Sequence, residues 1–390
     1  MAVNTLSKEQ IYTLTNLIAE EGQAVTNIQA TDLSSYISVA TSILALGTEK
    51  ALNSLMTVLQ RSIIAVRPYD EKFKGLEWSA DEWGAIVRKI SYADTYTDEE
   101  KAYTDAVTEG ASVDPWTVHK PNVLETHYYG SDVMSKWYTV YDYQVREAFS
   151  SPEALGSFIS GLFTHFSNER VQYLELLKKS LLVNAIAGKN AMNQDVINLR
   201  TEYNQATGNN FTLQDIMKPE NYKGFMDWAY ARISKVCREF TARSQKYQAV
   251  IDGKPIMRHT PYRDQRVYML AEFLEAMSSR VYANTYHENF LTYADVEAVD
   301  FWQAINQPDQ IKATPVIIDN TGAYSTGEAQ TMENVVGVIF DRDALGYNIF
   351  NDMLASTPLN PRGLYYNTFY HADIRLSTDF TEKICVITLN

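Results

Sequence analysis

The chain of 390 residues contains only two cysteines, Cys237 and Cys385, which lie far apart and belong to no Cys-x-x-Cys or Cys/His cluster. We expect both to be small buried hydrophobic residues rather than a disulfide or a metal site. Histidine is also scarce: the six histidines are scattered, without a His-Glu-x-x-His or His-x-His pattern. Histidine-based metal binding and acid–base catalysis are therefore not indicated, and we predict no metal and no cofactor.

Positive charge is in deficit, with 34 Lys and Arg against 48 Asp and Glu, for a net charge of −14. Because binding to a phosphate backbone relies on clustered Lys and Arg, a dedicated nucleic-acid reader is disfavoured. An acidic protein can still surround nucleic acid without binding it tightly.

No apolar run approaches the roughly 18–20 residues of a membrane span. The N-terminal MAVNTLSKEQ lacks the apolar core of a signal peptide, so we expect intracellular synthesis and no membrane partner.

Phosphate-loop and nucleophile motifs are missing as well. In the nearest approach to a phosphate loop, Gly188-Lys189, Val183 replaces the first glycine and Asn190 the hydroxyl residue. We interpret the pair as a helix C-terminus with a lysine at the negative end of the dipole. No Gly-x-Ser-x-Gly elbow occurs. These absences favour a protein that is not an enzyme.

Tyrosine, by contrast, is abundant: 26 residues, which suit strands and half-exposed interfaces. Residues 67–120 are polar and aromatic with little apolar periodicity, which is typical of a mobile loop or of an arm ordered by a neighbour. Trp78, Trp83 and Trp116 lie there. They can stack on a sugar or a base, but no basic residues interleave them. We favour a subunit interface, in which they anchor the arm on another subunit.

The strongest predicted element is a helix over residues 151–188. Ser151 is a good cap, Pro152 fits the first turn, and Glu153 lies at the positive end of the dipole. Apolar residues then recur at three- and four-residue steps until Gly188. About 36 residues make a rod of roughly 54 Å, which must brace something large or elongated.

The other elements are shorter. The first sixty residues have helical periodicity, and residues 266–277 are ambiguous between helix and strand. Strand patterns are present in SKWYTVYDYQV up to Val145, in residues 313–319 and 335–340, and in KICVITL. The last thirty residues also alternate like a strand. One face of that strand would carry Tyr366, Thr368, Tyr370, Ala372, Ile374 and Leu376. Long helices without regular strand–helix alternation indicate an α+β fold with antiparallel sheets.

Asp341 and Asp343 follow the apolar run VVGVIF and form the one candidate catalytic pair. Two residues apart on an extended backbone, their carboxylates can point the same way and share a divalent metal. The structural alternative is that Asp343 caps the segment ALGYNIF while Arg342 offsets the local negative charge. The residues alone leave both interpretations open.

Four stretches, taken in order, resemble the major capsid proteins of tailed bacteriophages, and most nearly those of small short-tailed phages. They are KPNVLETHYYGSDVMSKW, the helix from Ser151 to Gly188, DQRVYMLAEFLEA, and the C-terminal VVGVIFDRDALG with YYNTFYHADIRLSTDFTEKICVITLN. The resemblance implies the Hong Kong 97-type capsid fold. It also makes Asp341 and Asp343 the end of a structural strand rather than a catalytic pair.

The resemblance further implies a division of the chain. It comprises a helical N-terminal arm (1–66), an extended E-loop region (67–136), a peripheral domain (137–220) with a spine helix (151–188), an axial domain (221–345), and C-terminal strands that return to the peripheral domain (346–390).

By this resemblance, copies of the chain form pentamers and hexamers of an icosahedral shell. The shell would enclose double-stranded DNA without sequence-specific binding, with scaffolding and portal proteins as further partners. The protein would then lie in the virion capsid after synthesis in the bacterial cytoplasm. Two alternatives are an encapsulin-type nanocompartment shell and a metal-dependent enzyme that uses Asp341 and Asp343.

Overall fold

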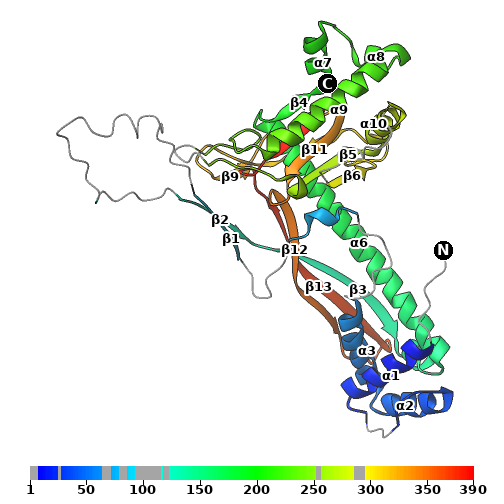
Figure 1. Ribbon diagram of the computed structural model, residues 1–390. Helices are drawn as coiled ribbons and strands as arrows, with labels where there is room; N and C mark the ends of the chain where they lie inside the picture. The colour runs from blue at the N-terminus through cyan, green and yellow to red at the C-terminus, as the bar shows by residue number, and fades with distance from the viewer. Residues whose placement is uncertain are drawn as a thin grey trace.

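A helix of 40 residues, α6 (Pro152–Ala191), runs along much of the elongated molecule (Figure 1). The computed structural model describes residues 8–24, 28–63, 72–78, 86–92, 116, 123–251, 256–284 and 295–390. The helix begins as predicted, because the Ser151 hydroxyl accepts a hydrogen bond from the Ala154 amide at 3.1 Å. At 1.5 Å per residue its length is about 60 Å, which exceeds the width of a small domain.

The helix ends at Ala191, so the predicted end at Gly188 is wrong. Gly188 is required for packing instead: a Cβ atom there would lie 2.5 Å from Cζ of Phe380, which is fully buried. Lys189 lies in the last turn of α6, as the interpretation of a lysine at the helix C-terminus requires. Its side chain is buried, and its ammonium group donates to the Asp195 carboxylate at 2.8 Å.

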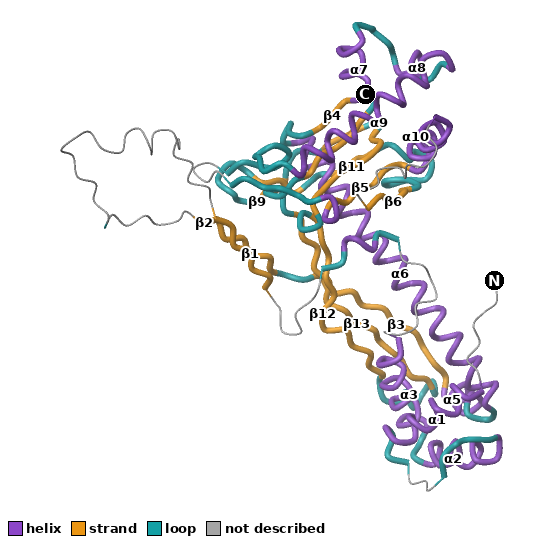
Figure 2. The backbone as a smooth tube through the Cα atoms, in the orientation of Figure 1, coloured by secondary structure: helices purple, strands orange, loops and turns teal. Residues whose placement is uncertain are grey.

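A three-stranded antiparallel sheet packs beside α6 (Figure 2), in the order β12 (Leu345–Ser356), β13 (Tyr365–Thr378) and β3 (Asp132–Tyr141). From Tyr366 to Ile374, every second residue of β13 is buried, as predicted. The predicted buried face also included Leu376, but that residue is 39% exposed. The alternation reverses at Arg375, whose buried guanidinium donates to the Gly130 carbonyl at 3.0 Å.

The strand predicted through Val145 stops at Tyr141, and the chain turns into α5 (Asp142–Ala148). The Gln144 side chain reaches back and accepts a hydrogen bond from the Tyr141 amide at 3.1 Å. This is half of a capping box, a local interaction that starts a helix despite the strand-like alternation of residues. Val145 consequently packs in a helical core.

Three helices of the N-terminal segment lie at one end of the molecule: α1 (Lys8–Glu21), α2 (Leu33–Ala45) and α3 (Thr48–Ile63). Their buried residues form a separate hydrophobic core with α5, with Leu155 and Ile159 from the start of α6, and with Tyr366 of β13. The helical interpretation of the first sixty residues agrees with these elements. They pack on the body of the subunit rather than extending from it.

The other end of the molecule contains a five-stranded mixed sheet. Its order is β4 (Val196–Asn198), β14 (Ile384–Thr388), β11 (Val335–Asp341), β5 (Gln265–Leu270) and β6 (Asp295–Val299). The two edge strands are parallel to their neighbours and the central pairs are antiparallel. Every residue of β11 and β14 is buried. Because β14 lies in this sheet, the expectation that all of residues 346–390 return to the peripheral sheet is wrong.

Helices surround this sheet: α7 (Leu199–Thr207), α8 (Leu213–Ile216), α9 (Pro219–Thr241) and α10 (Ala271–Asn284). The ambiguous segment 266–277 contains both structures, since β5 passes directly into α10. Smaller elements are the 3-10 turns η1 (Lys74–Leu76) and η2 (Tyr262–Asp264), the strand pair β7 (Ile311–Ala313) with β10 (Gln330–Met332), and the hairpin of β8 (Val316–Ile318) and β9 (Tyr324–Thr326).

A two-stranded antiparallel hairpin, β1 (Ile86–Tyr92) and β2 (Val123–Tyr129), projects sideways from the body (Figure 1).

Among the described helices, none combines the length and hydropathy needed to cross a membrane. Cys237 and Cys385 are both buried free thiols, as expected.

Two glycines of α6 test the packing of this helix. Gly188→Ala gains helix propensity but drives a methyl group into Phe380, so we expect a net loss of about 1–3 kcal/mol in the free energy of unfolding. Gly161→Ala is the matched control: in the described part of the chain, nothing beyond its own helix backbone and chain neighbours lies within 4 Å of its Cβ position, and we expect a gain of about 0.5–1 kcal/mol. Urea unfolding of the dispersed protein measures both. Equal stabilisation by the two substitutions would contradict the packing role.

Candidate functional site

The base of the hairpin is attached to its own subunit by Trp78. The Trp78 amide donates to the Tyr347 carbonyl at 2.9 Å, and its indole Nε1 donates to the Arg342 carbonyl at 3.2 Å. Its ring meets Tyr128 of β2 edge-on, with centroids 5.8 Å apart. The indole lies so close to Gly346 that a Cβ atom at that position would clash with it. Trp78 therefore joins the start of the hairpin to the turn between β11 and β12.

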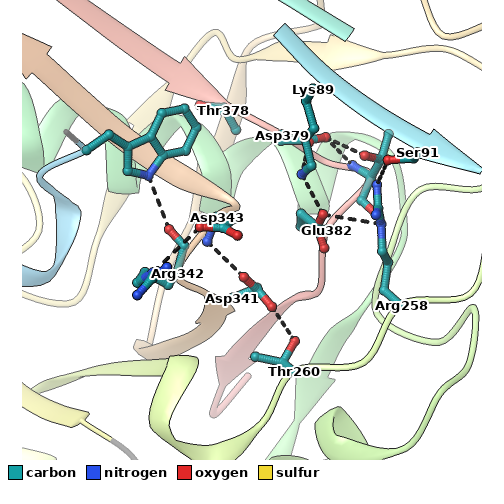
Figure 3. A network of polar contacts seen from close by, with 12 residues as sticks. Lys89, Ser91, Arg258, Thr260, Asp341, Arg342, Asp343, Thr378, Asp379 and Glu382 are labelled. Atoms are coloured by element: carbon teal, nitrogen blue, oxygen red, sulfur yellow. Dashed lines mark hydrogen bonds and ion pairs between the residues drawn. The ribbon is translucent and has the colours of Figure 1, made fainter. Parts of the chain in front are cut away.

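A cluster of four charged side chains fastens β1 to the body (Figure 3). The Lys89 ammonium group lies 2.7 Å from the Asp379 carboxylate and 2.5 Å from that of Glu382. Arg258 approaches Glu382 at 3.2 Å and donates to the Ser91 hydroxyl at 2.7 Å. The two positive and two negative charges balance, and the four side chains are together named the hairpin-base cluster: Lys89, Arg258, Asp379 and Glu382.

The electrostatics of this cluster are those of a buried ion network. Burial opposes the charge on Lys89, but the two carboxylates outweigh it and raise the pKa of Lys89. Burial likewise opposes the charge on Asp379, yet the Lys89 ammonium and the Thr381 hydroxyl lower the pKa of Asp379. For Glu382 burial prevails over the attraction of Lys89 and Arg258, and its pKa is raised. Removing one cation from such a network leaves an uncompensated buried charge.

Strand alternation explains why β1 can dock in this way. Lys89 and Ser91 face the body, whereas Arg88, Ile90 and Tyr92 face solvent. The hairpin-base cluster was not predicted from the sequence. The one local signal is the alternation of Lys89 and Ser91 on a short strand, and nothing near them in the chain points to Asp379 or Glu382, which lie about 290 residues away.

Asp341 and Asp343 do not share an extended backbone, because Asp341 ends strand β11 and Asp343 lies in the turn that follows. Asp341 is buried, and its two carboxylate oxygens accept hydrogen bonds from the Thr260 hydroxyl at 2.5 Å and the Asp343 amide at 2.8 Å (Figure 3). The Asp343 side chain is 61% exposed and lies beside Arg342. The predicted cap role of Asp343 is also wrong, because Asp341 makes the turn and the segment that follows is strand β12.

Burial raises the pKa of Asp341 more strongly than the bonds from Thr260 and Asp343 lower it. A hydrogen-bonded carboxylate of this kind holds a turn together. Within the described ranges, no group of three His, Cys, Asp or Glu side chains is placed to hold a metal ion.

The three predicted interface tryptophans have different positions. Trp78 contacts its own subunit, as described above. Trp116 is 86% exposed, and Trp83 lies outside the described residues. Their role in a subunit interface stays a prediction.

Lys383 is a further buried cation close to this region. Its ammonium group donates to the Ala242 carbonyl at 2.7 Å and the Ser244 hydroxyl at 3.2 Å, just beyond the end of α9. Its backbone carbonyl accepts a hydrogen bond from the Asp341 amide at 2.9 Å. Burial lowers the pKa of Lys383 to about 8, despite the nearby carboxylates of Asp341 and Glu239.

We expect Lys89→Met to destabilise the docked hairpin by about 3–5 kcal/mol, since Asp379 and Glu382 would remain buried without their shared cation. The control is the neighbouring Arg88→Met, which removes an exposed pair with Glu125 and should cost less than about 1 kcal/mol. Hydrogen exchange of the β1 amides measures the opening of the hairpin. Similar exchange in both variants would show that the buried cluster does not hold β1.

Lys383 should make stability depend on pH. The folded state releases this proton near pH 8 and the unfolded state near 10.5, so the unfolded state binds more protons between these values. The free energy of unfolding contributed by Lys383 therefore rises across this window, by about 2–3 kcal/mol. Urea unfolding of the protein and of Lys383→Met at pH 7.5 and 10 isolates the contribution of Lys383, because all other groups titrate in both proteins. If the difference in free energy of unfolding between the two proteins is the same at both pH values, the prediction is refuted.

Comparisons with known proteins agree with this geometry. No curated protein matches the chain. The capsid structure of Staphylococcus phage Andhra is similar, with a TM-score of 0.53 and 12% identity over 84% of this chain and 86% of that one. A chain in the structure of the head fiber and inner core protein gp22 of native bacteriophage P68 has a TM-score of 0.52 and 12% identity, over 82% of this chain and 85% of that one.

These likenesses show the fold, and they confirm the predicted α+β architecture of Hong Kong 97 type. Neither the encapsulin alternative nor the metal-dependent enzyme is supported by them. A family model described as the Phi29-like phage major capsid protein matches residues 13–388, nearly the whole length. The chain therefore belongs to the Phi29-like phage major capsid protein family and is a shell-forming structural protein.

Proposed function

We propose that copies of this chain assemble as pentamers and hexamers into an icosahedral shell around double-stranded DNA, without bond-making chemistry. The observation that carries the proposal is the hairpin of β1 and β2, which lies at the side of the body and is fastened to it by the hairpin-base cluster (Figure 1). A two-stranded hairpin alone is at best marginally stable in water. It is stabilised when a neighbouring subunit covers it.

The outward side chains of the hairpin suit such a contact. Ile90 and Tyr92 are exposed on β1, and Trp116 lies in the long connection between the two strands. Large exposed apolar and aromatic side chains are typical of protein interfaces. In this proposal Trp116 and Trp83 anchor the hairpin on a neighbouring copy, while Trp78 fixes the direction in which it leaves its own subunit.

The sheet of β12, β13 and β3 offers a second surface for neighbouring copies. Its outer face carries Trp137, Val133 and Met353, which are 68%, 58% and 52% exposed. Phe369 pairs in register with Trp137 and with Ala355, so aromatic and apolar residues extend across all three strands. A face of this kind is unusual on a monomer and favours an assembly.

The charge of the chain fits the proposed contents of the shell. A subunit with a net charge of −14 has little electrostatic attraction for a DNA backbone, so it can enclose the duplex without binding it tightly.

The proposal includes scaffolding and portal proteins as partners. It also includes location in the virion after synthesis in the bacterial cytoplasm. It keeps the domains 1–66, 67–136, 137–220, 221–345 and 346–390, except that β14 is reassigned to the five-stranded sheet, which contains the axial-domain strands β5, β6 and β11.

Negative-stain microscopy of the purified chain, alone and with a scaffolding protein from the same genome, tests the proposal. We expect closed shells of uniform size. A protein that remains monomeric under all assembly conditions would contradict it. A thermal shift with divalent metal that Asp341→Asn and Asp343→Asn both abolish would contradict the non-enzymatic role.

Two tryptophan substitutions separate assembly from folding. Trp116→Ala should raise the concentration needed for assembly roughly tenfold, as expected for an interface anchor, and leave the melting temperature of the subunit unchanged because its side chain is exposed. Trp78→Ala should lower the melting temperature, since its contacts are within the subunit. Light scattering and thermal unfolding measure the two effects. Normal assembly of Trp116→Ala would remove this residue from the interface.

A further inference from the structure

Helix α2, with the sequence LSSYISVATSILA, contains no charged residue. Its buried side, formed by Tyr36, Val39, Ala40 and Ile43, packs into the N-terminal core. Its opposite side is exposed and runs the length of the helix, with Leu33 56% and Ile37 50% exposed and Ser34, Ser38 and Thr41 beside them. These five residues are named the α2 face.

An exposed helix surface ordinarily carries charged residues. The neighbouring helices follow this rule: α1 exposes Lys8 and Glu9, and α3 exposes Glu49 and Lys50. The nearest charge to the α2 face along the chain is the N-cap residue Asp32, whose carboxylate accepts a hydrogen bond from the Ser35 amide at 2.8 Å. The α2 face therefore differs from the other solvated surfaces of its own helix cluster.

Two of the three hydroxyl groups of the α2 face are hydrogen-bonded within the helix. The Thr41 hydroxyl donates to the Ile37 carbonyl at 2.7 Å, and the Ser38 hydroxyl donates to the Ser34 carbonyl at 3.3 Å. Burial of a hydroxyl is costly when it loses its partner, but these hydroxyls keep theirs. These two hydroxyl groups can consequently leave water without losing their hydrogen-bond partners.

The position of the α2 face and the charge of the subunit bear on what can cover this face. The face is at the end of the elongated subunit opposite to α7, α8 and the five-stranded sheet (Figure 1). Each subunit carries a net charge of −14, so two copies repel each other over most of their surface. A contact related by a two-fold axis places each patch against itself, and an uncharged patch brings no like charges together.

We infer that the α2 face binds the α2 face of a second copy of this chain across a two-fold axis. Leu33 and Ile37 would interdigitate with their symmetry mates, and Ser34 and Ser38 would let the helix axes approach closely, as in ridge-into-groove packing. The inference rests on the proposed shell for its place in the assembly, whereas the contact itself needs only two copies.

Cysteine cross-linking tests the contact directly, because both natural cysteines are buried. Leu33→Cys, Ile37→Cys and Thr41→Cys are made one at a time in the full chain and oxidised mildly at high concentration and in assembled particles. Disulfide formation requires Cβ atoms within about 4.5 Å, so the position nearest the axis should give roughly tenfold more covalent dimer than the exposed control Asn53→Cys. Absence of dimer at all three positions in both preparations would overturn the inference.

Charge reversal gives a second readout. Ile37→Glu and Ile37→Lys should each reduce assembly roughly tenfold or more, because like charges would face each other at the axis. An equimolar mixture of the two variants should restore it, whereas Asn53→Glu and Asn53→Lys should assemble normally alone.

Normal assembly of either Ile37 variant alone, or failure of the mixture to recover while both proteins remain folded, would exclude the self-contact. If the unmodified chain forms no shells, the proposed function fails. The cross-linking of the concentrated soluble chain still decides the α2 contact in that case.

Discussion

The shape of the subunit depends on two elements that each pack into both of its hydrophobic cores. These elements, helix α6 and strand β13, are longer than either core and hold the two cores together. Helix α6 contributes Leu155 and Ile159 to the core of the N-terminal helices, and Leu182 and Ile186 to the larger core around the five-stranded sheet. Strand β13 spans the same distance, with Tyr366 in the first core and residues from Tyr370 onward in the second. The pairing of a long helix with a long sheet therefore stiffens a shape that no single core could support.

The hairpin is attached by a different kind of force. Its base is held by buried charges and by the indole of Trp78, while its outward side chains stay exposed. Buried ion pairs contribute more to geometry than to net stability, because the desolvation of each charge offsets much of the attraction. The hairpin-base cluster thus directs the hairpin. In the proposed assembly, apolar burial against another subunit supplies the stabilisation that the hairpin lacks by itself.

Structural contacts account for three buried charged residues, of which Asp341 was a catalytic candidate in the sequence. Asp341 has both carboxylate oxygens occupied by donors of its own chain, Lys189 is paired with Asp195, and Lys383 caps the chain beyond α9. Each perturbed group has a structural partner within the subunit. A strongly shifted pKa here reports burial in a large core rather than chemistry, which is consistent with a shell protein.

The sequence alone determined the elements whose signals are local and long: helix α6 with its Ser151 cap, the helices of the first sixty residues, and the buried strands β11 and β14. The order of these elements also carried the resemblance to phage capsid proteins. Only the tertiary structure decided which sheet β14 joins, where β3 passes into α5, and that Lys89 meets Asp379. Strand pairing and buried ion pairs join residues hundreds of positions apart, and neither leaves a periodic mark in the local sequence.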